Sequence, residues 1–153
     1  MAESSVPVHH TGFTVRDIGR STKFYCDHFG GEVVLGPLTF SDRDNEGLSR
    51  GVGVPGSRFT IVFISTGNTI LELLEYDPPG RDFALSNRDV GAAHVSFQVS
   101  DIAAVYERLR ASGVSFIAPP SRMQDGEAVG SQFAYCLDPD GIPVELIQVP
   151  QEA

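Results

Sequence analysis

The chain has 153 residues, of which 41% are hydrophobic and 20% charged, a balance typical of one soluble globular domain and unlike that of disordered or collagen-like chains. Eleven basic and 20 acidic residues give a net charge of −9 at pH 7, which argues against nucleic acid or an anionic membrane as a partner, because both attract basic surfaces. No apolar run reaches the ~20 residues that span a bilayer, and no signal peptide is visible. We therefore expect a cytoplasmic protein in which residues 1–153 form a single domain.

The first half of the chain predicts one helix among four strands. Apolar and alternating runs predict strands at residues 6–15, 32–40, 58–65 and 69–76, and helical spacing predicts a helix at 20–29. Asp17 could cap that helix, and Gly30 ends it. Pro37 indicates that the second strand lies at a sheet edge or contains a bulge. The polar, Gly-rich residues 41–57 predict a loop.

The second half repeats this order of elements after a linker at residues 77–91. Strands are predicted at residues 92–99, 114–118, 131–137 and 143–149, a helix runs from Asp101 to about Ser112, and a loop covers 119–130. The two halves therefore form pseudo-repeat modules, residues 6–76 and 92–149, each with the order βαβββ.

Two pairs of matching motifs support the repeat. HTGFTVRDI begins at His10 and HVSFQVSDI begins at His94, and they agree at five of nine positions. The modules also end alike, with LELLEY around Glu72 and VELIQV around Glu145. Each module therefore offers one histidine on its first strand and one glutamate on its last strand.

The glutamates stand out because of their apolar neighbours. Strand alternation places Glu72 on the face opposite to Leu71 and Leu73, and an ionised carboxylate on a buried face costs several kcal/mol unless it is paired or bound to a cation. The same argument applies to Glu145. Alternation also directs His9 away from the face of His10.

Pseudo-twofold symmetry between the modules would bring these histidines and glutamates together. Two imidazoles and two carboxylates suit a divalent metal that keeps open positions for water or substrate. The predicted metal ligands are His10, Glu72, His94 and Glu145.

The motifs resemble the vicinal oxygen chelate superfamily, which groups glyoxalases, bleomycin-resistance proteins and extradiol dioxygenases. The matching segments are HHTGFTVRDIGRSTKFY, TILELLEY, AAHVSFQVSDI and FAYCLDPDGIPVELI. The resemblance covers residues 6–149. It implies an α+β fold in which two tandem βαβββ modules form an open, cup-shaped mixed sheet with flanking helices around a metal.

The resemblance also assigns roles to the four candidate ligands. His10, Glu72, His94 and Glu145 match the family's ligand positions, and one divalent ion per chain is implied, with Co, Ni, Mn, Fe, Zn and Mg left undistinguished. The four-ligand set resembles glyoxalase I and methylmalonyl-CoA epimerase. These metal-dependent lyases and isomerases move a proton next to a carbonyl through an enediolate that the metal stabilises. Glu145 and Glu72 are then the acid/base candidates, acting on a small-molecule substrate such as an acyl-CoA or a thiol adduct.

Two other functions stay open at this point. An Fe(II) extradiol-type dioxygenase has a similar fold but uses two histidines and one carboxylate, so Glu72 would fill a position needed by substrate or oxygen. A drug- or metabolite-binding module of the resistance type would keep the four residues without turnover. The ligand set favours the epimerase or glyoxalase I type.

The long loop at residues 41–57 is the main departure from the family pattern. We hypothesise that it covers the site and that Arg50 or Arg58 meets a substrate carboxylate or phosphate, the alternative being an ordinary surface loop. Glu46 is a candidate for the loop base of the epimerases. The family habit also implies a homodimer.

Overall fold

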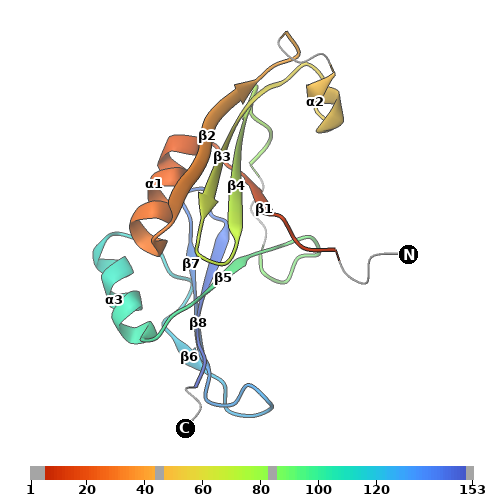
Figure 1. Cartoon of the computed structure of the whole chain (residues 1–153). Coiled ribbons are helices and arrows are strands. Elements are labelled where there is room, and N and C mark those ends of the chain that lie inside the picture. The colour runs from red at the N-terminus through yellow and green to blue at the C-terminus, as the bar shows by residue number, and fades with distance from the viewer. Residues whose placement is uncertain (1–5, 44–46, 83–85, 151–153) are drawn as a thin grey trace. The chain divides into compact units, whose positions relative to one another are not determined.

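Each half of the chain builds its own four-stranded mixed sheet in the computed structural model (Figure 1). The structure describes residues 6–43, 47–82 and 86–150. Contacts divide the chain into unit 1, Met1–Asp82, and unit 2, Phe83–Ala153. Two mixed sheets with flanking helices confirm the predicted α+β class.

Unit 1 places its first strand beside its last. It contains β1 (Thr11–Thr14), α1 (Ile18–Phe29), β2 (Glu32–Phe40), α2 (Leu48–Gly51), β3 (Arg58–Ser65) and β4 (Ile70–Asp77). The strand order is β1-β4-β3-β2, with β1 parallel to β4 and the other neighbours antiparallel. The second strand is thus an edge strand, and its register shifts on both sides of Leu35, as Pro37 predicts.

Unit 2 has the same topology. It contains β5 (Val95–Gln98), α3 (Ile102–Ala111), β6 (Ser121–Arg122), β7 (Gln132–Leu137) and β8 (Pro143–Gln148). The order is β5-β8-β7-β6, and β5 runs parallel to β8. Within the described parts of both units, no helix has the length and apolar character needed to cross a membrane.

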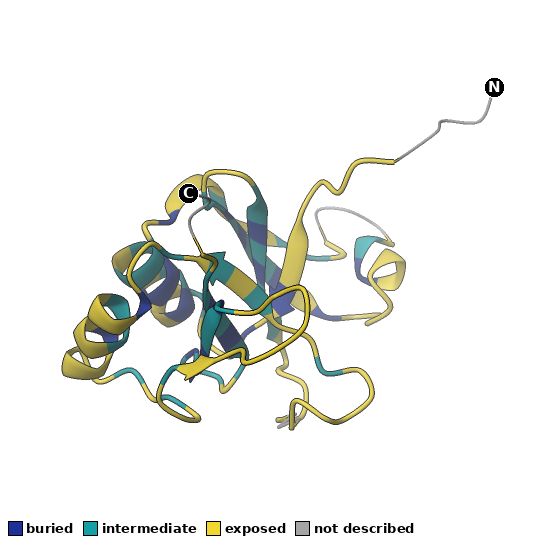
Figure 2. Ribbon diagram, turned by 90° about the horizontal axis from the view of Figure 1, so that it is seen from below, coloured by how far each residue is buried: buried dark blue, intermediate teal, exposed yellow. Residues whose placement is uncertain are grey.

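Apolar side chains in alternate positions of the strands form the core of each unit. In unit 1, Leu71 and Leu73 of β4 are fully buried, and α1 packs against β3 and β4 with Phe24 and Tyr25 buried. In Figure 2 each of the two longer helices is buried on one side and exposed on the other. The first long helix thus packs on the sheet of unit 1, and α3 packs against β7 and β8 in unit 2.

The two long helices begin at equivalent aspartates. The Asp17 carboxylate accepts a hydrogen bond from the backbone N–H of Arg20 at 2.8 Å, and Asp101 accepts one from Ala104 at 3.0 Å. These bonds satisfy amides that lack partners inside a helix. The first helix ends at Gly30, whose φ of 68° lies in the left-handed region that favours glycine. The predicted cap and stop are both confirmed.

A second hydrogen bond, here called the helix clamp, joins the first residue of each long helix to the last strand of its own unit. Glu75 Oε2 on β4 accepts a hydrogen bond from the backbone N–H of Ile18 at 2.7 Å. Gln148 Oε1 on β8 accepts one from Ile102 at 2.8 Å. The repeat thus includes the contact that anchors each helix N-terminus.

The first strand of each unit is shorter than predicted. Residues 6–10 carry no strand hydrogen bonding, and β1 starts at Thr11, opposite Leu71. In this parallel register Ile70, the first residue of β4, lies level with His10, so the residues before His10 have no neighbouring strand to pair with. Strand β5 likewise begins at Val95, opposite Val144 near the start of β8, and not at residue 92.

The edge of the second sheet also differs from the prediction. The strand expected at 114–118 is reduced to a single bridge between Phe116 and Cys136, and a two-residue strand, Ser121–Arg122, lies inside the expected loop. Residues 119 and 120 are both prolines, which cannot donate to a strand ladder. The prolines therefore divide this edge into two short pieces.

The loop expected at residues 41–57 contains a short helix and its own polar contacts. The Asp42 carboxylate accepts hydrogen bonds from the backbone N–H and the hydroxyl of Ser49, and the Ser49 hydroxyl accepts one from the Gly56 N–H. The bond from the Ser49 hydroxyl is the main reason that the pKa of Asp42 lies below its usual value. Glu46 lies outside the described residues.

The helix clamp gives a prediction for stability. Replacing Glu75 with Ala removes the acceptor for the Ile18 N–H and should lower the free energy of unfolding by about 1–2 kcal/mol. Glu75→Gln should retain most of the stability, because unit 2 uses a glutamine at the equivalent position. Urea unfolding measures both changes. Equal stability of Glu75→Ala and wild type would contradict the clamp.

Candidate metal centre

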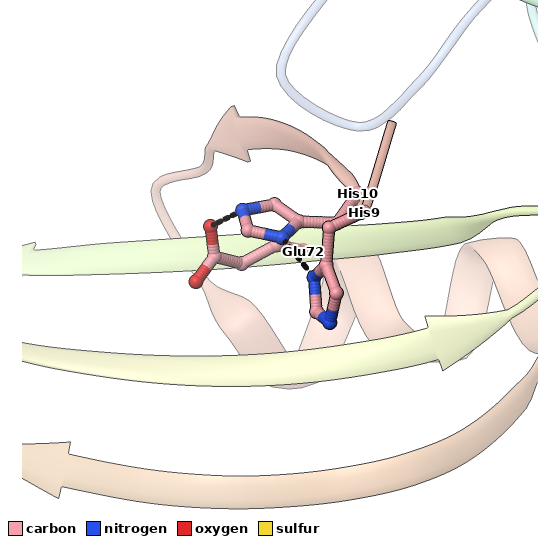
Figure 3. A network of polar contacts seen from close by, with 3 residues as sticks. All are labelled: His9, His10 and Glu72. Carbon is pink, nitrogen blue, oxygen red and sulfur yellow. Dashed lines mark hydrogen bonds and ion pairs between the residues drawn. The ribbon is translucent and has the colours of Figure 1, made fainter. Parts of the chain in front are cut away.

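In unit 1, His10 and Glu72 lie side by side. Strand pairing sets Glu72 opposite Gly12, and His10 lies two residues before Gly12 on the same chain segment. His10 Nε2 is 3.1 Å from Glu72 Oε2 (Figure 3), and the two side chains are 35% and 16% exposed. A histidine nitrogen and a carboxylate oxygen are thus held together at a partly exposed position.

Apolar residues surround Glu72 on its face of the sheet. Phe63 on β3 is its cross-strand partner, and Leu74 follows two residues along β4. A Cβ atom added at Gly12 would lie 3.3 Å from Glu72 Oε2 and 3.4 Å from Leu74 Cδ1. The carboxylate therefore lies directly over the glycine, and the predicted alternation of the LELLEY segment is confirmed.

Unit 2 contains a second pair of the same kind. Glu145 pairs with Ser96, and His94 lies two residues before Ser96. His94 Nε2 is 3.5 Å from Glu145 Oε2, and the side chains are 42% and 15% exposed. The two pairs thus occupy equivalent registers, since each histidine precedes by two the residue that faces its glutamate.

Tyr135 distinguishes the pair of unit 2. It is the cross-strand partner of Glu145, and its ring meets that of His94 edge to face at a centroid distance of 5.3 Å. Burial raises the pKa of Tyr135, as do its hydrogen bond to Glu145 and the charge of that carboxylate. Tyr135 was not among the predicted site residues. The turn that begins at Asp138 could have revealed this contact. In a hairpin centred on that turn, Tyr135 lies opposite Glu145.

His9 contradicts the prediction that it faces away from His10. Its Nδ1 lies 2.7 Å from His10 Nδ1, and both rings contact Phe63. The prediction was wrong because alternation holds only in a strand, and residues 9 and 10 precede β1. The first histidine therefore belongs to the polar network of the second (Figure 3).

The separation within each pair suits a shared cation. Two ligands bound to adjacent positions of one divalent ion, each at about 2.1 Å, lie roughly 3.0–3.4 Å apart. The His–Glu separations of 3.1 and 3.5 Å are close to that range. Within either unit, the described residues include no group of three His, Cys, Asp or Glu side chains that could hold a metal. Each unit by itself therefore offers two candidate ligands.

The arginines singled out in the sequence lie at cavities of unit 1. Arg58 lines a cavity of about 290 Å³ together with Arg16 and Tyr76. Arg50 lines another of about 380 Å³ beside Asp42. A role for either arginine in binding substrate stays a prediction.

Comparisons with known proteins identify the family to which the chain belongs. A family model described as the Glyoxalase/Bleomycin resistance protein/Dioxygenase superfamily matches residues 8–146. The chain is 32% identical over 153 residues to a 2-epi-5-epi-valiolone epimerase from an Actinomyces species, covering 97% of this chain and 82% of the other. It is 29% identical over 143 residues to a probable lactoylglutathione lyase from Synechocystis, covering 91% and 92%.

The fold matches a solved structure as well. A glyoxalase family protein from Bacillus cereus superposes with a TM-score of 0.81 over 99% of both chains, at 19% sequence identity. That likeness bears on the fold, whereas the family model covers most of the sequence. The chain therefore belongs to the glyoxalase/bleomycin resistance protein/dioxygenase superfamily, as its motifs predict.

Proposed function

We propose that His10, Glu72, His94 and Glu145 bind one divalent metal ion, and that the chain is an epimerase that moves a proton on a carbon next to a carbonyl group. The observation that carries this proposal is the repeated His–Glu pair, with separations of 3.1 and 3.5 Å in the same strand register. Stability is a weak alternative reason for such pairs, because partly exposed ion pairs contribute only about 0–1 kcal/mol.

The donor atoms determine which ions would fit. Imidazole nitrogens and carboxylate oxygens accept Co, Ni, Mn, Fe, Zn and Mg, and two ionised glutamates balance the charge of a divalent ion. When bound, such an ion acts as a Lewis acid that polarises a carbonyl oxygen and makes the adjacent C–H more acidic.

The two glutamates are the groups to which we assign proton transfer. Tyr135 lies directly opposite Glu145 in the β7–β8 ladder, within reach of its carboxylate. The raised pKa of Tyr135 keeps its hydroxyl protonated at neutral pH. Epimerisation removes a proton from one face of a carbon and delivers one to the other face. Glu145 and Glu72, which come from different units, would provide the two groups.

The named relatives guide the choice between epimerase and lyase. The relative at 32% identity is an epimerase and spans nearly the whole chain, whereas a lactoylglutathione lyase matches at 29%. We therefore place an epimerisation of a small carbonyl compound first. Substrates built on an acyl-CoA or a thiol adduct remain candidates of the same chemistry.

An edge strand of unit 1 supports a homodimer as part of this proposal. Among the residues that the structure describes, strand β2 has a neighbouring strand, β3, on one side only. Val33, Val34 and Leu35 on it are 45–55% exposed. An exposed apolar edge strand is a surface that proteins commonly cover, and a second copy of the chain would cover it.

Proton exchange tests the proposed reaction. The protein, loaded with divalent metal, is incubated in deuterated water with α-branched acyl-CoA thioesters, glutathione hemithioacetals and 2-epi-5-epi-valiolone, and NMR follows deuterium incorporation beside the carbonyl. We expect incorporation with at least one of these classes. Glu145→Gln should slow it by about 100-fold or more, the usual contribution of a positioned acid/base group.

Glu107→Gln is a matched control, since Glu107 lies on α3 and its exposed carboxylate is 3.5 Å from the exposed Arg110. Exchange at the wild-type rate in Glu145→Gln would contradict the role of this glutamate. Oxygen uptake with catechols would favour the dioxygenase instead. Tight ligand binding without exchange or turnover would favour the binding module.

The glycine under Glu72 gives a second prediction. Gly12→Val would push the Glu72 carboxylate away from His10, because even a Cβ atom at this position lies 3.3 Å from Oε2. We expect divalent metal to bind about tenfold more weakly, as when the surroundings of a ligand are disturbed. Ser96→Ala in unit 2 is the control, since Ser96 already carries a Cβ atom opposite Glu145. Unchanged affinity in Gly12→Val would show that Glu72 is not a ligand.

A further inference from the structure

His10 uses both of its ring nitrogens. Its Nε2 faces Glu72 Oε2 at 3.1 Å, and its Nδ1 lies 2.7 Å from His9 Nδ1 (Figure 3). Two nitrogens at that distance form a hydrogen bond in which one carries the proton and the other supplies the lone pair. Whether His9 Nδ1 carries a proton therefore depends on whether His10 Nδ1 carries one.

Aromatic packing holds the two imidazoles in this arrangement. Their rings meet at 87° with centroids 5.0 Å apart, and both contact the ring of Phe63, at 6.4 Å from His9 and 5.4 Å from His10. Phe63 is itself the cross-strand partner of Glu72. The same phenylalanine thus packs against both histidines and faces the glutamate of the pair.

We propose that His9 is a positioning residue whose Nδ1 accepts the Nδ1–H hydrogen bond of His10 when metal is bound. This inference rests on the proposed metal site. A neutral imidazole has one N–H and one lone pair, so binding an ion through Nε2 requires the proton on Nδ1. Histidines that ligate metals almost always donate that N–H to an acceptor, which fixes the tautomer and orientation of the ring. His9 supplies such an acceptor in unit 1.

In unit 2, an alanine stands at the position equivalent to His9. Ala93 precedes His94 and has no side-chain acceptor, and the His94 ring packs edge to face against Tyr135. The repeat therefore supplies equivalent ligand pairs with different supports: an imidazole acceptor beside His10, and a tyrosine beside His94 and Glu145. The affinity for metal therefore depends on His9 through His10, whereas Ala93 contributes nothing through His94.

Two substitutions of His9 separate its acceptor from its ring. His9→Phe keeps an aromatic ring against Phe63 and removes the acceptor, whereas His9→Asn keeps an oxygen acceptor and removes the ring. Chelator competition with Zn²⁺ measures the affinity of each full-length variant. We expect His9→Phe to bind Zn²⁺ about 10–100-fold more weakly than wild type, and His9→Asn to bind within a few-fold of it.

Two further measurements test the mechanism and the fold. In the Zn²⁺-loaded wild type, ¹⁵N-histidine NMR should show the proton of His10 on Nδ1 and none on His9 Nδ1. Urea unfolding of the metal-free proteins should give His9→Phe the same stability as wild type, so that a loss of affinity is not a loss of fold. His28→Phe, on α1, controls for the removal of a histidine.

The outcomes distinguish this inference from the proposed function. Wild-type affinity in His9→Phe, equal weakening in both variants, or a proton on His9 Nδ1 in the loaded protein would each overturn the role of His9 and leave the metal site standing. A wild-type protein that binds no divalent metal would overturn the site and the role of His9 together.

Discussion

Parallel pairing of the first strand with the last strand sets where the glutamate of each His–Glu pair lies relative to its histidine. In each unit that register places a histidine two residues ahead of the residue that faces a glutamate: Gly12 opposite Glu72, and Ser96 opposite Glu145. A shift of the register by one residue would turn the glutamate to the helix-covered face. The His–Glu pairs therefore depend on the same backbone hydrogen bonds that join the first strand to the last strand in each sheet.

The last strand of each unit also connects the site to the helix. On β4, Glu72 lies on one face beside His10, and Glu75, three residues later, accepts the Ile18 N–H at the start of α1 on the other face. The two neighbours of Glu72 along β4, Leu71 and Leu73, are fully buried. Because buried leucines fix the strand against the helix, the carboxylate on the opposite face has a defined position. The glutamine clamp in unit 2 repeats the arrangement.

Much of this could be read from the sequence, since alternation and capping are local. The LELLEY segment assigned Glu72 to the face opposite to Leu71, and Asp17 marked the helix start. Local patterns failed where the outcome depends on neighbouring strands. The position of His9 followed from the start of β4 at Ile70, which leaves residue 9 outside the β1–β4 ladder. The contact of Tyr135 with Glu145 required the hairpin register.

The central claim is that the two His–Glu pairs share one ion, and metal content tests it most directly. Wild type, His10→Ala/Glu72→Ala and His94→Ala/Glu145→Ala are loaded with Zn²⁺, desalted and analysed for metal per chain. A shared site predicts one ion in wild type and none in either double variant, because removing two of four ligands destroys it. Two ions in wild type with one kept in each variant, or no ion in wild type, would contradict the account.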